Sequence, residues 1–195
     1  MDSNNAMLKN LASSIQTKQT MLADKALLDT ITQIAHLLVM AFKDGKKVLF
    51  CGNGGSAADA QHLAAELSGR YYYDRPPLFA EALHVNTSYL TAVANDYSFD
   101  EVYARMIRAI GQEGDVLIGL STSGNSANVL RAIEDARSLQ MHTIGFTGAG
   151  GGRLKTSCDH WVPVPSNDTP RIQECHMLIG HTLCEIVEQA MFPKL

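Results

Sequence analysis

The sequence of 195 residues lacks several features that would narrow its class at once. Its four cysteines form no C-x-x-C pair, which argues against a disulfide framework. A formal net charge of −4 gives no basic surplus of the kind that nucleic-acid binding requires. No apolar run approaches the roughly 18 residues of a membrane span, because Gln33 and His36 interrupt the most apolar stretch, and the polar N-terminus has no signal-peptide pattern. We therefore expect a cytoplasmic enzyme or binding protein without nucleic-acid or membrane contacts.

Strands and helices alternate along most of the chain. Helical patterns at 8–22 and 26–43 come first, and a long one at 169–191 comes last. Short apolar segments between them predict five strands, at 47–51, 78–83, 116–120, 142–146 and 161–165. Helical patterns separate most of these strands, which implies parallel pairing with right-handed crossovers. The sequence thus predicts an α/β fold, a doubly wound five-stranded parallel sheet flanked by helices. We expect one domain over 1–195, with a helical segment at 1–45 and the α/β core and last helix at 46–195.

A hydroxyl-rich loop follows the third predicted strand, with the sequence Ser121-Thr122-Ser123-Gly124-Asn125-Ser126. Ser126 is expected to cap the next helix, whose free N–H groups and dipole favour an anion. Serine hydroxyls add donors without adding charge, so a phosphate monoester is the natural ligand. The alternative is an ordinary serine–glycine turn with a helix cap.

A glycine-rich loop follows the first predicted strand and contains the pattern G-x-G-x-x-A between Gly52 and Ala57. A dinucleotide site would need an acidic residue at the end of the second strand, where the sequence reads Leu-His-Val-Asn, and no Walker lysine is present. We expect instead that the glycines let the backbone approach a sugar phosphate, with Asn53 and Ser56 donating hydrogen bonds.

Two pairs of residues have the chemistry and helical spacing of metal ligands. His62 and Glu66 are four apart, and Gln173 and His181 are eight apart, so each pair shares a helix face. Together they would suit a divalent metal such as zinc. The alternatives are a solvated helix pair for the first two and a polar stripe at a subunit interface for the others. His176 lies near the second stripe and could be mistaken for the ligand.

These motifs together resemble the sugar isomerase (SIS) domain family and, within it, the phosphoheptose isomerases. The resemblance covers nearly the whole chain. It is carried by the segment Cys51 to Tyr71, by Asn95-Asp96, by the serine loop, and by Arg171 to Met177 with His181. Pro170 departs from the pattern, because some members have an acidic residue there.

The resemblance implies a role for each matching residue. It places the metal ligands, for one Zn²⁺ per subunit, at His62, Glu66, Gln173 and His181, with Glu66 and His181 as the acid/base pair. It places the phosphate loop at Ser121, Thr122, Ser123 and Ser126, and the other substrate contacts at Asn53, Gly54, Gly55, Ser56, Glu66, Asn95, Asp96 and Gln173. The zinc would either release part of its ligation during turnover or mainly preorganise the site.

The implied reaction is an aldose–ketose isomerisation. Sedoheptulose 7-phosphate would become D-glycero-D-manno-heptose 7-phosphate through an enediol or enediolate, for lipopolysaccharide or capsule precursors. The family's sites lie between subunits of a homotetramer, and apolar stripes on the N-terminal helices and the last helix predict such an assembly unless they only cover their own sheet. One alternative is isomerisation of another sugar phosphate. The other is a regulator of the SIS family that binds the replication initiator DnaA, although that relative lacks the glutamate and second histidine present here.

Overall fold

The computed structural model describes residues 3–194, and its centre is one parallel β-sheet. The strands are β1 (Val48–Gly52), β2 (Ala80–Ala82), β3 (Val116–Leu120), β4 (His142–Thr147) and β5 (His160–Pro163). They lie side by side in the order β2-β1-β3-β4-β5, and every neighbouring pair is parallel. The predicted doubly wound, five-stranded α/β sheet is confirmed.

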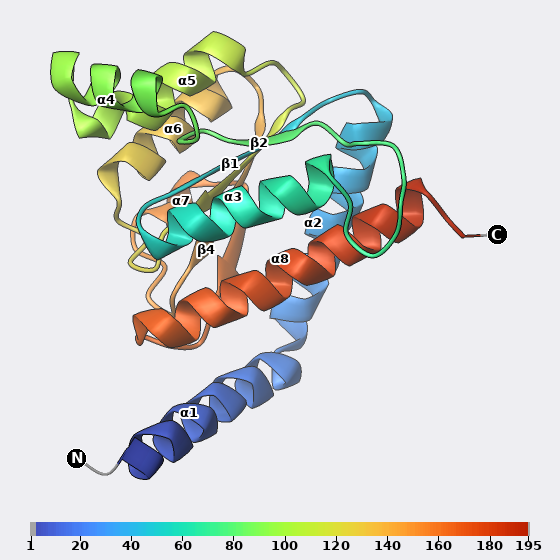
Figure 1. Ribbon diagram of the computed structural model, residues 1–195, viewed down its shortest axis with the longest axis vertical. Coiled ribbons are helices and arrows are strands. Elements are labelled where there is room, and N and C mark those ends of the chain that lie inside the picture. Colours follow the sequence, from blue (N-terminus) through green and yellow to red (C-terminus); the bar gives the residue numbers. More distant parts are fainter. Residues whose placement is uncertain (1–2, 195) are drawn as a thin grey trace.

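Helices cover both faces of this sheet (Figure 1). One layer contains α2 (Lys25–Lys43), α3 (Gly55–Ser68) and α8 (Thr169–Met191). The other contains α4 (Thr87–Asp96), the short 3₁₀ helix η1 (Phe99–Glu101), α5 (Val102–Ile110), α6 (Ala127–Ser138) and α7 (Leu154–Ser157). The first helix, α1 (Ser3–Ala23), extends away from the sheet at the lower end of the view.

Alternation along the strands produces two hydrophobic cores. Val48 and Phe50 of β1 join the core beneath α2, α3 and α8, whereas Leu49 and Cys51 join the core beneath α4 to α7. All five residues of β1 are buried, as are those of β3, because helices cover both faces of a parallel sheet. The sheet is therefore a rigid base whose carboxyl edge presents the loops after β1 and β3.

By length and composition, α2 alone among the described helices could cross a membrane, with a mean hydropathy of 1.3. Gln33 and His36 interrupt the apolar stretch, as noted from the sequence, but they do not lower the mean hydropathy of the helix enough to exclude it on this criterion. In the fold, Leu27, Ile31 and Ile34 of this helix are buried against the sheet layer, as in a core helix.

The element boundaries differ from the prediction where local contacts replace the regular pattern. The second strand is shorter than the predicted 78–83, because the Leu78 N–H donates to the Leu67 carbonyl at the end of α3 rather than to a strand. The helical residues 99–110 begin as the 3₁₀ helix η1 and continue as α5. The four-residue α7 gives too short a pattern to be recognised in the sequence.

Candidate metal and sugar-phosphate site

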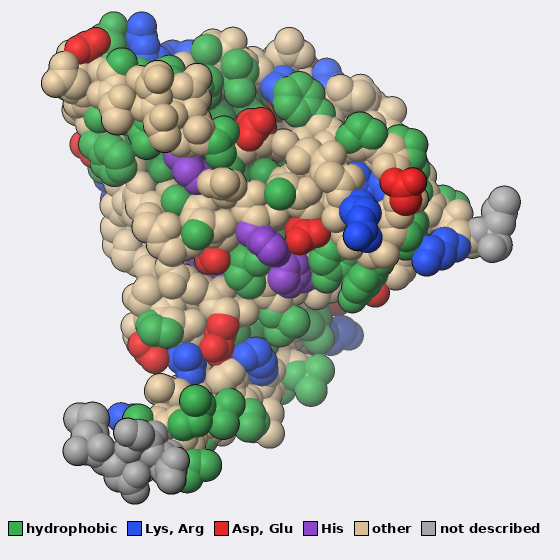
Figure 2. All heavy atoms as spheres, in the orientation of Figure 1, with side chains coloured by type: hydrophobic (Ala, Val, Ile, Leu, Met, Phe, Trp, Pro, Cys, Tyr) green, Lys and Arg blue, Asp and Glu red, His purple; other side chains and the backbone are tan. Residues whose placement is uncertain are grey.

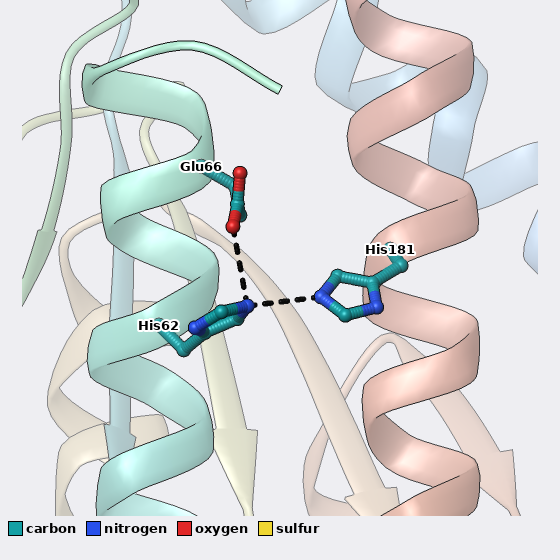
Figure 3. Close-up of side chains that lie close together, drawn as sticks. All are labelled: His62, Glu66 and His181. Carbon is teal, nitrogen blue, oxygen red and sulfur yellow. Dashed lines mark hydrogen bonds and ion pairs between the residues drawn. The ribbon is translucent and has the colours of Figure 1, made fainter. Parts of the chain in front are cut away.

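Three of the predicted ligands meet between α3 and α8 (Figure 3). His62 and Glu66 lie one turn apart on α3, and His62 Nε2 is 3.2 Å from Glu66 Oε1. His181 comes from α8, and its Nε2 lies 3.0 Å from His62 Nε2. One ligand atom from each residue lies within 4.8 Å of the others. His62 is exposed and Glu66 and His181 are half-buried, so the group is accessible to a ligand. Figure 2 shows histidine and acidic side chains at the surface of this face.

The donor set fits a divalent transition metal. Two nitrogens bound to a tetrahedral zinc about 2.0–2.1 Å away lie about 3.3 Å apart, close to the separations seen here. Imidazole nitrogens together with one carboxylate oxygen are also ligands that zinc accepts. The three side chains are therefore already near the geometry of a metal centre.

Gln173 lies at the opposite end of this helix pair, against the start of α3. A Cβ on Gly55 would be 2.5 Å from Gln173 Nε2, so any larger residue here would displace the Gln173 side chain. Gln173 is two turns before His181 on α8. The pairs Gly55–Gln173 and His62–His181 therefore both lie along the line where α3 packs against α8, the α3–α8 seam. The seam thus connects the predicted fourth ligand to the first glycine-rich loop.

The serine loop leaves the sheet beside that first loop. Gly52 and Leu120, the last residues of β1 and β3, are register partners, so Asn53 and Ser121 begin the two loops at neighbouring positions. Ser126 occupies the N-cap position of α6, but its side chain makes no capping bond. Its Oγ lies 2.8 Å from Ser121 Oγ instead. Ser126 is therefore the N-cap residue that was predicted, but its hydroxyl turns into the loop and makes no capping hydrogen bond.

The backbone of the serine loop is arranged as an anion site. The carbonyl of Thr122 accepts from Gly148 N at 3.0 Å, and that of Gly124 accepts from Leu154 N at 3.0 Å. Within residues 3–194, the N–H groups of Thr122, Ser123 and Ala127 have no hydrogen-bond partner. Carbonyls held inward and free N–H groups at a helix N-terminus are the arrangement that binds phosphate.

Comparison with known proteins agrees with this geometry. Residues 11–148 match the SIS domain. A phosphoheptose isomerase from Aneurinibacillus thermoaerophilus is 47% identical over 189 residues, covering 97% of this chain and 96% of that one. One from Rhodospirillum rubrum is 56% identical over 161 residues, covering 83% and 86%. The solved phosphoheptose isomerase from Francisella tularensis has a TM-score of 0.92 at 40% identity and covers 97% and 100%. The chain belongs to the phosphoheptose isomerases of the SIS domain family.

The gonococcal relative supports the same assignment. The solved structure of the phosphoheptose isomerase GmhA from Neisseria gonorrhoeae has a TM-score of 0.89 at 43% identity, covering 95% of this chain and 98% of that one. Likeness over almost the full length of both chains includes α8, which lies beyond the matched SIS segment and contributes His181.

Not every predicted contact residue is brought to this seam. Asn95 and Asp96 are exposed at the end of α4, and the Asn95 amide donates to Asp96 Oδ1 at 2.9 Å. No hydrogen bond in the described chain joins them to the serine loop or to the histidines. Ser56 is only 3% exposed, at the base of the first loop. Gly54 and Gly55 are exposed and present their backbone to solvent.

His176 is separated from the metal ligands by its environment. Its ring is fully buried, with Nε2 3.2 Å from the Thr147 carbonyl and its centroid 5.5 Å from that of Phe146. Burial lowers the pKa of this imidazole to about 4. A neutral histidine donating to the end of β4 is a core residue, which separates it from the similarly spaced His181.

Two contacts around the site are absent from the sequence prediction. The segment 148–154 holds the carbonyls of the serine loop, and its only sequence signal is a glycine-rich run directly after β4. Asn128, buried in the first turn of α6, exchanges hydrogen bonds with Asn53. Nothing in the spacing of these two asparagines, 75 residues apart, indicates that they pair.

Proposed function

We propose that this protein interconverts sedoheptulose 7-phosphate and D-glycero-D-manno-heptose 7-phosphate. The observation that carries the proposal is the meeting of His62, Glu66 and His181 between α3 and α8, the helix pair whose opposite end borders the glycine-rich loop next to the serine loop. Relatives of 47% and 56% identity that are named phosphoheptose isomerase support the same reaction.

The reaction moves a proton between C1 and C2 of the sugar through an enediol or enediolate. It needs a base at the carbon and an acid at the oxygen, and such positioned groups contribute about 10²–10⁴-fold. We assign these transfers to Glu66 and His181, which face the same space from α3 and α8 (Figure 3). Two helices packed on one sheet keep the carboxylate and the imidazole at a fixed separation, as proton transfer requires.

The metal in this proposal is zinc, one ion per subunit, held by His62, Glu66, Gln173 and His181. When bound, it would polarise the substrate oxygens and stabilise negative charge on them. Gln173 enters this set through the family pattern: its amide lies against Gly55 at the start of α3, about two turns before His62, and would have to turn along α8 toward His181 to bind the ion.

We assign the phosphate to Ser121, Thr122, Ser123 and Ser126, whose loop has free N–H groups and four hydroxyls. Binding the phosphate far from C1 and C2 fixes the orientation of the sugar, so remote binding energy supports catalysis. Asn53, Gly54, Gly55 and Ser56 would contact the sugar, with the exposed glycines offering backbone donors.

We further propose that the protein is a cytoplasmic homotetramer with its sites at subunit interfaces. Exposed apolar side chains on α1, among them Leu8, Leu11 and Ile15, together with Leu28 and Leu178, support the assembly. Most of the stripe on α2 covers its own sheet, so these remaining residues are the available contact surface. Exposed Asn95 and Asp96 would reach a substrate bound by a neighbouring subunit. The heptose would supply a lipopolysaccharide or capsule precursor.

The test is turnover of sedoheptulose 7-phosphate, followed by NMR, with protein stripped by chelator and then given zinc. Zinc-restored formation of the aldoheptose phosphate is expected. Glu66→Gln and His181→Gln should each abolish turnover with the fold intact, whereas His142→Gln, at an exposed strand end, should not. Activity above a few per cent of wild type in both site variants would rule out the acid/base assignment.

Two other outcomes would redirect the function. Turnover of a pentose phosphate in preference to the heptose would keep the reaction and change the substrate. No turnover of any sugar phosphate by folded, zinc-loaded protein would favour the regulator that binds DnaA, and a pull-down with DnaA would then test it.

A further inference from the structure

A buried ion pair joins the end of α3 to α8. The side chains of Arg75 and Glu188 are 2% and 1% exposed, and Arg75 Nε lies 3.2 Å from Glu188 Oε1. The same carboxylate accepts hydrogen bonds from the backbone N–H groups of Tyr71 at 2.9 Å and Tyr72 at 2.8 Å. These donors and Arg75 lower the pKa of Glu188 although burial alone would raise it, so the carboxylate stays charged at neutral pH.

Arg75 also caps the C-terminal end of α3. Its Nη1 donates to the carbonyls of Leu67 at 2.7 Å and Gly69 at 3.0 Å, and its Nη2 donates to the carbonyl of Glu66 at 2.7 Å. The last carbonyls of a helix have no partner within the helix, and a cation there also complements the helix dipole. One guanidinium thus holds the turn of α3 from which the Glu66 side chain projects.

The other half of the pair connects to His181. Glu188 lies two turns after His181 on the same helix. Through the backbone of Tyr71, it also places the Tyr71 ring, whose centroid is 5.7 Å from that of His181. Glu66 therefore contacts Arg75 through its own backbone carbonyl, and His181 is connected to Glu188 through Tyr71.

A gain in folding stability does not by itself explain the buried Arg75–Glu188 ion pair. Removing two charges from water costs several kcal/mol per ion, and apolar side chains of similar volume often stabilise a core equally well. What an apolar pair could not do is donate to three carbonyls of one helix end while accepting two N–H groups of the following loop. The network fixes geometry rather than only filling space.

We propose that Arg75 and Glu188 are positioning residues that set the spacing between Glu66 and His181. The effect on turnover rests on the proposed isomerase function, whereas the effect on metal binding does not. Loosening the pair lets the end of α3 move relative to α8. The separation of the carboxylate and the imidazole is then no longer fixed, although the serine loop keeps its structure.

The experiment uses Glu188→Gln, with Asp115→Asn as its matched control. Asp115 is also a buried carboxylate that accepts two backbone N–H groups, from Lys47 and Gln112, and it lies 2.5 Å from the Lys47 ammonium. It precedes β3 at the amino edge of the sheet, the edge opposite the site loops. Both variants lose a buried ion pair, but only one borders the metal ligands.

Four quantities are measured for each variant: the free energy of unfolding, kcat and KM for sedoheptulose 7-phosphate, and the affinity of stripped protein for Zn²⁺ alone. Supporting contacts around metal ligands are typically worth about 10–100-fold in metal affinity or activity. For Glu188→Gln we expect kcat and Zn²⁺ affinity each to fall about tenfold or more, with KM within about twofold of wild type. For Asp115→Asn we expect lower stability with both values near wild type.

A second variant covers the case in which Glu188→Gln does not fold. Arg75→Lys keeps the positive charge opposite Glu188 but cannot reach all the carbonyls, and it should show the same fall in kcat and Zn²⁺ affinity. Wild-type values in a folded variant at either position, or equal losses in Asp115→Asn, would overturn the proposal. If wild-type protein does not turn over the heptose, the function fails while the Zn²⁺ measurement still decides the positioning role.

Discussion

The side-chain amides of Asn53 and Asn128 donate hydrogen bonds to one another, and both bonds are 2.9 Å long. Asn53 begins the loop after β1, and Asn128 lies in the first turn of α6, directly after the serine loop. Tyr103 adds a third contact, donating to the neighbouring Gly52 carbonyl at 2.5 Å. The Asn53 side chain is thus engaged with protein, and the sugar loop and the phosphate loop are held as one unit.

Asn128→Ala should therefore weaken substrate binding. Loss of both hydrogen bonds frees the Asn53 side chain and the first loop, at a cost of about 1–2 kcal/mol, which corresponds to about a tenfold rise in KM. Steady-state kinetics on sedoheptulose 7-phosphate would measure the change. A urea unfolding curve separates it from general destabilisation, and an unchanged KM in a folded variant would show that the two loops are not coupled.

The helices and strands were predictable because the residues that each element buries recur in the sequence at the spacing of that element. Strand β3 and helix α8 agree with the predicted segments 116–120 and 169–191 at both ends. The continuous run of β3 is buried on both faces, and a flexible Gly114 and Pro170 mark nearby boundaries. Where a contact from another element decided the end, as at Leu78, the local pattern could not give it.

Only the parts of the site that lie on one helix could be predicted from the spacing of their residues. His62 and Glu66 share a face by their spacing of four, but their distance from His181 is set by the packing of α3 on α8. The Arg75–Glu188 pair was missed for the same reason. The two residues are 113 positions apart, and arginine and glutamate are residue types that usually lie at the surface. The family resemblance supplied the ligand set, which the residues alone had left beside simpler alternatives.

Gly124→Ala should damage phosphate binding specifically. Gly124 has φ +67°, and a Cβ there would lie 2.0 Å from the Gly151 carbonyl oxygen, so the serine loop must shift. Gly45→Ala is the matched control, because it has φ +70° with nothing within 4 Å of the added Cβ. Left-handed strain costs both variants about 1–2 kcal/mol of stability.

Only Gly124→Ala should also raise KM and the inhibition constant of inorganic phosphate, by about tenfold or more, since several N–H donors are displaced together. Inhibition by phosphate is the direct measurement. Equal inhibition constants in the two variants would place the phosphate elsewhere.

His176 should make the protein less stable as the pH falls below neutral. Its folded pKa is about 4 because the ring is buried, whereas an exposed imidazole titrates near 6.5. Between these values the unfolded chain binds more protons, so stability is lost as pH decreases, by about 1.4 kcal/mol per pH unit. From pH 6.5 to pH 5 this single residue should cost about 2 kcal/mol.

His176→Gln removes this titration and keeps a donor for the Thr147 carbonyl. Its free energy of unfolding, from urea curves at pH 7 and pH 5, should therefore change less than that of wild type. His142→Gln, with an exposed ring, should behave as wild type. Parallel losses in all three proteins would mean that other groups cause the acid sensitivity.

Leu178→Lys should dissociate the proposed tetramer. Leu178 is 45% exposed beside Leu28, which is 42% exposed, in an apolar groove of about 220 Å³ between α1, α2 and α8. A lysine ammonium in an interface core loses its hydration without gaining a partner, which typically costs several kcal/mol.

Met40→Lys, on the same layer but outside the groove and 55% exposed, is the matched control. Light scattering should give a smaller particle for Leu178→Lys alone. If the sites lie between subunits, turnover should disappear with the tetramer, and an active monomer would show that one chain contains the complete site.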